Sequence, residues 1–219
     1  MDESSEILFA DKPKGITSFD VIRLLRKKLG IKKMGHAGTL DPFATGLLIV
    51  GIGEGTKRLN EYMGLPKTYV MDVLLGRRTD TGDPEGMTLE EKEVKEIDES
   101  LLKKILKEME GEIELPIPKY SAVKHKGIPL YAYARKNILV EEKLRTTRIF
   151  YLKLLGIEPR EKSVVLKIEM KCEKGTYARA VGEEIGGRLG VPAMLENLRR
   201  TKIGDIDVSK AEKLVNDII

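Results

Sequence analysis

Apolar and polar positions follow two different periods along the chain, and each period predicts one kind of element. Short apolar runs rich in β-branched or aromatic residues, bounded by Gly, Pro or charged turns, are typical of strands. They cover residues 7–10, 47–50, 68–75, 148–155 and 163–170. Apolar residues at helical spacing predict helices over residues 17–30, 100–110, 177–189 and 209–218. Strands and helices do not alternate regularly, so the order favours an α+β domain over a doubly wound parallel sheet.

The first predicted helix has clear ends and a basic polar side. Thr17 and Asp20 form a Thr-x-x-Asp capping pair at its start, and Gly30 ends it. Its polar side and the residues just beyond carry six cations: Arg23, Arg26, Lys27, Lys28, Lys32 and Lys33. A ridge of this kind can contact phosphates, but it can equally be an ordinary solvated helix face, which is what spacing alone favours.

Composition excludes several classes of protein. The chain of 219 residues has one Cys and two His, so neither a disulfide framework, a cysteine-based zinc cluster nor a His-led metal site is expected. Cys172 is interpreted as a small buried residue. No apolar run approaches the roughly 18 residues that span a bilayer, and the first six residues are too acidic for a signal or transit peptide. We therefore expect a soluble, cytoplasmic protein with neither metal nor cofactor.

The net charge of +4 is unevenly distributed. Residues 85–114 hold 11 acidic and 5 basic side chains, so this stretch carries −6 and the rest of the chain +10. Such segregation favours a basic face that suits a phosphate backbone. A solvated Lys/Glu surface, as in heat-tolerant proteins, explains the composition equally well.

The densest candidate for chemistry is the segment of residues 35–46, which reads GHAGTLDPFATG. Three glycines and a proline in twelve residues predict a tightly shaped loop. Pro42 pushes Asp41 out of helical geometry and presents its side chain from an extended backbone. Taken alone, an Asp-Pro in a Gly-rich loop is more often a turn former than a catalytic pair.

This loop, together with four further segments in the same order, closely resembles the TruB family of tRNA pseudouridine synthases. The other segments are residues 12–18 (KPKGITS), 67–69 (KTY), 118–135 (PKYSAVK continuing to LY and AR), and 174–179 (KGTYAR) followed by 198–201 (LRRT). The match covers about residues 7–204, nearly the whole chain. Five ordered motifs are far more specific than any one of them.

The resemblance implies a pseudouridine synthase fold, with a mixed, largely antiparallel central sheet flanked by helices and an RNA-binding cleft. It implies that the chain isomerises uridine 55 of the tRNA TΨC loop. The uridine N1–C1′ bond breaks, the base turns, and C5 is joined to C1′. The catalytic residue implied is Asp41, whose carboxylate could add to the base, attack the sugar or promote a glycal-like intermediate. Arg179 is implied as the cation that keeps this carboxylate ionised against desolvation.

The resemblance also implies residues that hold the flipped base. Tyr69 would stack on the base near C5, and an aromatic face there is worth about 1–3 kcal/mol. Tyr177 and Leu198 would form apolar pocket walls, and Lys67 would support Tyr69 rather than act catalytically. His36 would fill the gap that the flipped bases leave in the loop stack. Residues 79–83 (TDTGD) also match the family, but there we favour a structural turn over a site.

The resemblance further implies the organisation and the partners. About fifteen residues follow Gly204, too few for the C-terminal RNA-binding PUA module of many relatives. We therefore expect one catalytic domain over residues 1–219, acting as a monomer on the tRNA TΨC stem-loop without a membrane or a guide RNA. His125, between two lysines, is a candidate phosphate contact. Two alternatives stay open: a tRNA-folding chaperone without essential catalysis, and a synthase that acts on another structured RNA.

Overall fold

The computed structural model describes residues 6–136 and 138–214. Two compact units form within them: the first comprises the chain up to Val70 and from Leu198 onward, and the second is Met71–Asn197. Two strands, β4 (Lys67–Leu75) and β12 (Ala193–Ile203), contribute residues to both units. In the described part of the chain, no helix has the length and apolar character needed to cross a membrane.

The first unit is a mixed sheet with one long helix on it. The hydrogen-bonded strand order is β14-β1-β3-β12, with β2 added to β3 and β13 added to β12. β1 pairs antiparallel with β3, whereas β14 joins β1 and β12 joins β3 in parallel. The elements are β1 (Glu6–Lys12), α1 (Ser18–Leu29), β2 (Met34–His36), β3 (Thr45–Ile52), the 3-10 helix η1 (Gly53–Arg58), α2 (Leu59–Met63), β13 (Ile206–Asp207), the 3-10 helix η2 (Val208–Lys210) and β14 (Glu212–Lys213).

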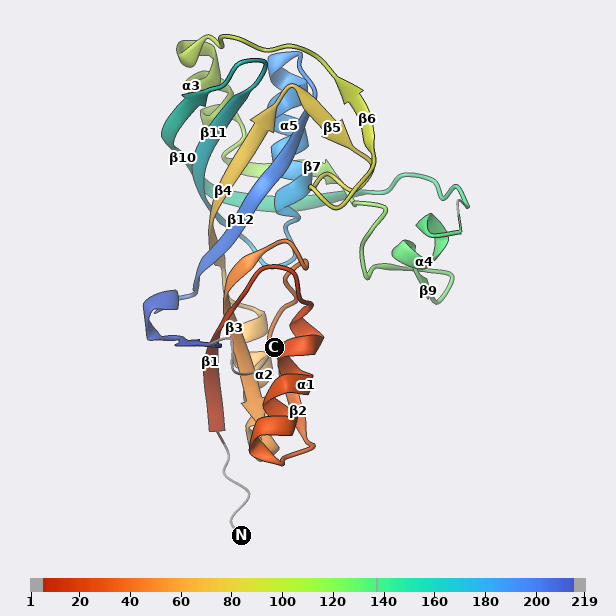
Figure 1. Ribbon diagram of the computed structural model, residues 1–219, viewed down its shortest axis with the longest axis vertical. Helices are drawn as coiled ribbons and strands as arrows, with labels where there is room; N and C mark the ends of the chain where they lie inside the picture. Colours follow the sequence, from red (N-terminus) through yellow and green to blue (C-terminus); the bar gives the residue numbers. More distant parts are fainter. Residues whose placement is uncertain (1–5, 137, 215–219) are drawn as a thin grey trace. The chain divides into compact units, whose positions relative to one another are not determined.

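Strand β3 is buried on both faces, which explains its uninterrupted apolar run. Because successive side chains of a strand point to opposite faces, Leu48 and Val50 pack with Val21 and Ile22 of α1. Leu47 and Ile49 pack on the other side, in a cluster that includes Ala37, Leu59 and Ile203. Figure 1 shows α1 lying alongside β3. The sheet of the first unit is thus covered on one face by α1 and on the other by the segments around α2 and β13.

The predicted ends of the first helix are confirmed. The Thr17 hydroxyl accepts a hydrogen bond from the Asp20 amide at 3.0 Å, and the Asp20 carboxylate accepts one from the Thr17 amide at 2.9 Å. These two bonds form a capping box. Gly30 ends the helix in the left-handed conformation, with φ of +70°, which glycine adopts without steric cost.

The second unit contains the other large part of the sheet, in the order β12-β4-β11-β10-β7. Strands β11 and β7 pair antiparallel with β10 on its two sides. Helix α5 packs tightly on β12, because Gly182 and Gly186 leave no room for a Cβ against Leu195 and Ala193. The remaining elements are β5 (Arg77–Thr79), β6 (Thr88–Glu91), α3 (Glu99–Glu108), β7 (Gly111–Pro116), β8 (Lys124–His125), β9 (Ile128–Pro129), α4 (Leu130–Ala134), β10 (Leu144–Pro159), β11 (Val164–Cys172) and α5 (Ala178–Leu189).

Most of the predicted elements are confirmed, and so are the α+β class and the mixed sheet. Each predicted strand falls inside an observed one, apart from the first residue of the 163–170 run. The helices predicted over 100–110 and 177–189 are α3 and α5 with shifted ends. Cys172 is buried on β11, as expected. His125 lies in the short β8–β9 hairpin.

The helix predicted over residues 209–218 is wrong for its described part. The chain instead forms the 3-10 turn η2, which the Asp207 carboxylate caps by accepting a hydrogen bond from the Ser209 amide at 2.9 Å. It then pairs in parallel with the free edge of β1, with Glu212 opposite Ala10. The open edge of β1 offers backbone partners that an isolated terminal helix would lack. Residues 215–218 of the prediction lie outside the described residues.

Candidate active site

The loop of residues 35–46 connects β2 to β3 in the first unit. His36 is the last residue of β2, Asp41 lies half-buried in the irregular part of the loop, and Thr45 begins β3. The Ala44 amide donates to the Asp41 carbonyl at 3.1 Å, so the Asp-Pro segment turns back on itself. Gly38 and Gly46 have φ of +94° and +108°, a region that disfavours any residue with a side chain. The predicted tight loop is confirmed.

Two side chains that precede the loop in the chain hold it from one side. Lys12 is fully buried at the end of β1, and its ammonium donates to the carbonyls of Pro42 at 3.2 Å and Ala44 at 2.7 Å. Ser18, in the first turn of α1, exchanges hydrogen bonds with the backbone of Leu40 at 2.9 and 3.2 Å. The backbone around Asp41 is therefore fixed on both sides of that residue by groups from other elements.

A third side chain, Arg200 of β12, contacts the same loop and affects His36. Burial lowers the pKa of His36 below its usual value, and the positive charge of Arg200 lowers it further. The imidazole ring is therefore favoured in its neutral form near pH 7. A neutral, planar ring is the form suited to stacking against bases.

Three more of the predicted site residues lie in the first unit. Lys67 and Tyr69 begin β4, where Tyr69 is 9% exposed, and Leu198 is buried on β12. The Lys67 ammonium donates to the carbonyls of Met63 at 2.8 Å and Leu65 at 2.6 Å. It thereby shapes the turn between α2 and β4, which agrees with a supporting role beside Tyr69.

Arg179 lies in the second unit, in the first turn of α5, and is 4% exposed. Its guanidinium donates to the carbonyls of Thr81 at 2.7 Å and Tyr120 at 2.9 Å. The Asp83 carboxylate lies 3.6 Å from the same guanidinium. Tyr177 immediately precedes the helix as its N-cap residue.

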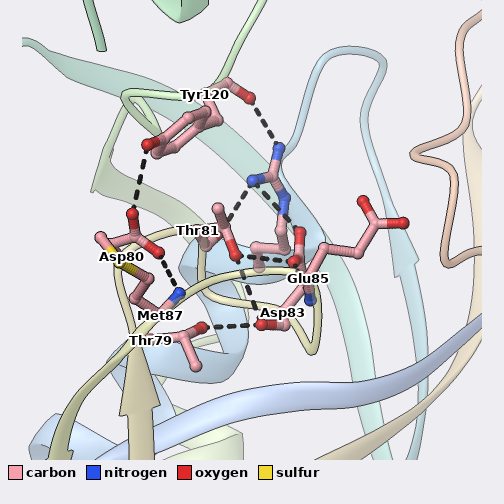
Figure 2. A network of polar contacts seen from close by, with 8 residues as sticks. Thr79, Asp80, Thr81, Asp83, Glu85, Met87 and Tyr120 are labelled. Atoms are coloured by element: carbon pink, nitrogen blue, oxygen red, sulfur yellow. Dashed lines mark hydrogen bonds and ion pairs between the residues drawn. The ribbon is translucent and has the colours of Figure 1, made fainter. Parts of the chain in front are cut away.

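The turn of residues 79–83 supports this arginine. The Asp83 carboxylate accepts hydrogen bonds from the Thr81 hydroxyl at 2.6 Å and the Glu85 amide at 3.0 Å, and Figure 2 shows these three residues converging. The Tyr120 hydroxyl donates to the Asp80 carboxylate at 3.2 Å. Burial and the Asp80 charge raise the pKa of Tyr120. The structural turn predicted here is present, and it has the additional role of holding Arg179.

A cavity of about 430 Å³ adjoins this turn within the second unit. Asp80, Tyr120 and Glu183 line it, together with Tyr133 of α4 and the segment of residues 138–143. Burial raises the pKa of Glu183, partly offset by the nearby charges of Arg78 and Arg179. The cavity is the largest recess described beside the Arg179 network, and it is bordered by both acidic and aromatic groups.

The structure therefore places the seven predicted site residues in two groups. His36, Asp41, Lys67, Tyr69 and Leu198 belong to the first unit, and Tyr177 and Arg179 to the second. The expected pairing of Arg179 with Asp41 spans the two units and stays a prediction. Among the described residues, no group of three or more His, Cys, Asp or Glu side chains is arranged to hold a metal ion.

Sequence reasoning missed the supporting residues Lys12, Arg200 and Asp83. All three lie inside segments that carried the family resemblance or matched it, so a signal was present. Their roles could not be read from it, because each acts on backbone atoms far away in the chain. Lys12 lies 30 residues from Pro42, and Arg179 lies 98 residues from Thr81.

Comparison with known proteins agrees with this site. Solved structures similar to the chain include one chain of a Cbf5-Nop10-Gar1 complex, with a TM-score of 0.71 and 28% identity. Another is a chain of an H/ACA RNP bound to a substrate RNA containing 2′-deoxyuridine, with a TM-score of 0.70 and 28% identity. These alignments cover 95% of this chain but only about half of each solved chain, 52% and 50%. They support the predicted fold.

Sequence comparison then gives the family. The model of the TruB family pseudouridylate synthase (N terminal domain) matches residues 26–178, more than half of the chain. A tRNA pseudouridine synthase B from Desulfotalea psychrophila is 43% identical over 96% of this chain and 86% of its own length. The proteins of that name from Syntrophotalea carbinolica and Aquifex aeolicus are 40% and 42% identical, over 67% and 71% of their lengths. The chain belongs to the TruB family, which confirms the resemblance seen in its five motifs.

Proposed function

We propose that this protein converts uridine to pseudouridine in tRNA, at uridine 55 of the TΨC loop. The observation that carries the proposal is the Asp41 loop. It lies within the family match, and it is held by buried polar groups from three other elements. Relatives about 40% identical over most of this chain are named tRNA pseudouridine synthase B.

In the proposed reaction the chain's own residues do three things. The Asp41 carboxylate initiates cleavage of the N1–C1′ bond, acting on the base or on the sugar. Tyr69, Leu198 and Tyr177 hold the base while it turns, so that C5 meets C1′. No group is gained or lost overall, because the proton that leaves C5 is balanced by one taken up at N1. The reaction is redox-neutral.

Base flipping has to be supplied from the same protein. Extruding a base costs a few kcal/mol of stacking. A neutral His36 ring, favoured by the lowered pKa, can occupy the space that the base leaves. Tyr69 offers an aromatic face to the extruded base, which recovers part of the cost.

We further propose that the two units act together as one catalytic domain and that the protein works as a cytoplasmic monomer without a guide RNA. The similarity to proteins named tRNA pseudouridine synthase B supports tRNA as the partner. Helix α1 adds a basic surface for its backbone. Lys27 and Lys28 are exposed there, while Arg26 donates to the Met34 carbonyl and Lys33 pairs with Glu54.

The test uses purified full-length chain and unmodified tRNA made by transcription, with pseudouridine mapped at each uridine. We expect product at uridine 55 and none in a tRNA that carries cytidine at that position. Product at a different uridine, or in total RNA but not in tRNA, would favour a synthase with another structured RNA as substrate. No product at any uridine would contradict the proposal.

A further inference from the structure

Arg200 occupies an unusual place for an arginine. It lies on β12 opposite Gly46, the residue that ends the Asp41 loop, and the two strands run parallel there. Its side chain is 1% exposed, one of the largest fully buried side chains among the described residues. An arginine cannot lose its proton in a protein, so a full positive charge is buried directly behind this loop.

The close approach of the two strands aims this side chain at the loop. Gly46 has φ of +108°, and a Cβ at that position would lie 2.8 Å from the Arg200 amide nitrogen and overlap its carbonyl oxygen. Only a glycine satisfies both conditions. The Arg200 side chain therefore starts at the C-terminal end of the loop and extends beneath it.

The guanidinium uses its donors on loop carbonyls that lie before and after Asp41. Nε donates to Leu47 at 2.8 Å, Nη2 to Gly38 at 3.1 Å and Nη1 to Thr39 at 3.4 Å. A planar fork with fixed donor directions constrains its three acceptors relative to one another. The two ends of the segment that carries Asp41 are thus tied to one rigid group.

This arrangement is poorly explained as a device for stability alone. Within residues 6–136 and 138–214, no carboxylate is hydrogen-bonded to or ion-paired with Arg200. A buried charge without a counter-ion is costly, and well-packed apolar residues often stabilise a protein better than buried ionic groups do. What the guanidinium provides and an apolar side chain does not is a fixed geometry for three loop carbonyls.

We propose that Arg200 is a positioning residue for catalysis: it holds the backbone on both sides of Asp41 so that the carboxylate is presented in its reactive orientation. This inference rests on the proposed function, since it assigns Arg200 a role in the same reaction. Arg200 acts through Asp41 and the loop and does not contact the nucleoside. A misplacement of about 1 Å in a reacting group can cost about 100-fold in rate, so the effect belongs to kcat.

The experiment measures kcat and KM from the release of tritium from tRNA labelled at C5 of uridine. Three variants are compared with the wild-type chain below all of their unfolding temperatures. Arg200→Met removes the charge and the three hydrogen bonds, and Arg200→Lys keeps the charge but not the fork. The third, Ile22→Val or Ile22→Ala in the core under α1, is the one whose unfolding temperature matches that of Arg200→Met.

We expect Arg200→Met to lose about 100-fold in kcat with KM within about threefold of wild type. Arg200→Lys should recover part of this loss, and the matched Ile22 variant should keep kcat within about threefold. Amide hydrogen exchange provides a readout without activity: exchange at residues 38–47 should accelerate in Arg200→Met but not in the Ile22 variant.

Several results would overturn the inference. One is a kcat for Arg200→Met no lower than that of the matched core variant, which would make Arg200 an ordinary structural residue. Another is a change confined to KM, and a third is unchanged exchange in the loop. A wild-type chain that releases no tritium from tRNA would instead contradict the proposed function, while the exchange measurement would still test the role of Arg200 in holding the loop.

Discussion

Each unit contains a buried arginine that donates to backbone carbonyls, and the two differ in what they hold. Arg179 in the second unit contacts the carbonyls of Thr81 and Tyr120 and has the Asp83 carboxylate 3.6 Å away. Arg200 in the first unit contacts only carbonyls of the Asp41 loop. In the second unit the turn positions the arginine, whereas in the first unit the arginine positions the loop.

The difference indicates where each unit places its functional group. In the first unit the functional group is a carboxylate on an irregular loop, so the loop needs external support. In the second it is the guanidinium of a helical residue, so the surrounding turn supplies carbonyls and a counter-charge. Substitutions in the two networks should therefore have different effects, and five predictions test this.

The largest effect is expected for Asp41→Asn, which replaces the carboxylate by an amide of nearly the same shape. Loss of the charged group should lower kcat by about 1,000-fold or more, because a positioned catalytic carboxylate contributes on this scale. Binding of tRNA, measured by filter retention, should stay within a few-fold of wild type. A variant that loses binding and activity in proportion would argue against a chemical role, and full rescue of a deletion strain by Asp41→Asn would favour a tRNA-folding chaperone.

Asp83→Asn should strongly affect the second network. It removes the negative partner of a buried arginine, which costs on the order of 3 kcal/mol in the free energy of unfolding. Denaturant unfolding measures this loss, and kcat should fall as well if Arg179 serves Asp41. The matched control is Asp80→Asn, which affects the Tyr120 hydroxyl and the Met87 amide but not the guanidinium. Equal loss in the two variants would contradict the role given to Asp83.

Gly46→Ala tests the close approach behind the loop in the first unit. The added Cβ would meet the Arg200 backbone at a residue whose φ is +108°. Overpacking and backbone strain together should lower the free energy of unfolding by about 2–3 kcal/mol. Gly64→Ala is a suitable control, because its φ is negative and its Cβ would meet open space. If the two variants are equally stable, the strands do not approach as closely as described.

The basic face of α1 should matter for affinity rather than for chemistry. The double variant Lys27→Glu and Lys28→Glu should raise KM by about 10-fold and reduce the salt dependence of tRNA binding by roughly one per lost phosphate contact. The same reversal at Lys103 and Lys104 on α3, within the acidic stretch, should leave both quantities unchanged. An unaltered salt slope in the α1 variant would assign this face to ordinary solvated surface.

The smallest effect concerns pH. Burial and Arg200 lower the pKa of His36 in the folded chain, so the unfolded chain binds the proton more readily. Stability should therefore be highest above the unfolded value of about 6.5 and should fall as the pH drops through it toward the folded pKa. Thermal unfolding from pH 8 to pH 5 should show a smaller decline in His36→Gln than in wild type. An identical decline would mean that His36 is not the group responsible.

The fold was predictable where local pattern and tertiary structure agree. The Thr17–Asp20 capping pair and Gly30 define α1, and the apolar runs define β3 and β4, because these signals involve neighbouring residues. The terminal helix was wrong, since the pairing of Glu212 with Ala10 depends on an open strand edge 202 positions earlier in the chain. Helical spacing in a short segment cannot reveal such a partner.

The candidate site was predictable through the family resemblance and hardly at all through spacing. Asp41, Tyr69 and Arg179 came from motifs, whereas nothing local distinguishes Lys12 from any lysine before a proline. Its role follows from being fully buried under the carbonyls of Pro42 and Ala44. Long-range contacts of side chains with backbone atoms leave little trace in a single sequence, and they are what the structure adds.

The single cysteine has a practical consequence. Cys172 is enclosed within β11, so thiol reagents that modify exposed cysteines should leave it untouched in the native chain. A cysteine introduced at an exposed position, such as Lys28 on α1 or Leu139 beside the cavity of the second unit, would then be the one thiol open to a fluorophore or spin label. Without further engineering, the chain is suited to site-specific spectroscopy of its encounter with RNA.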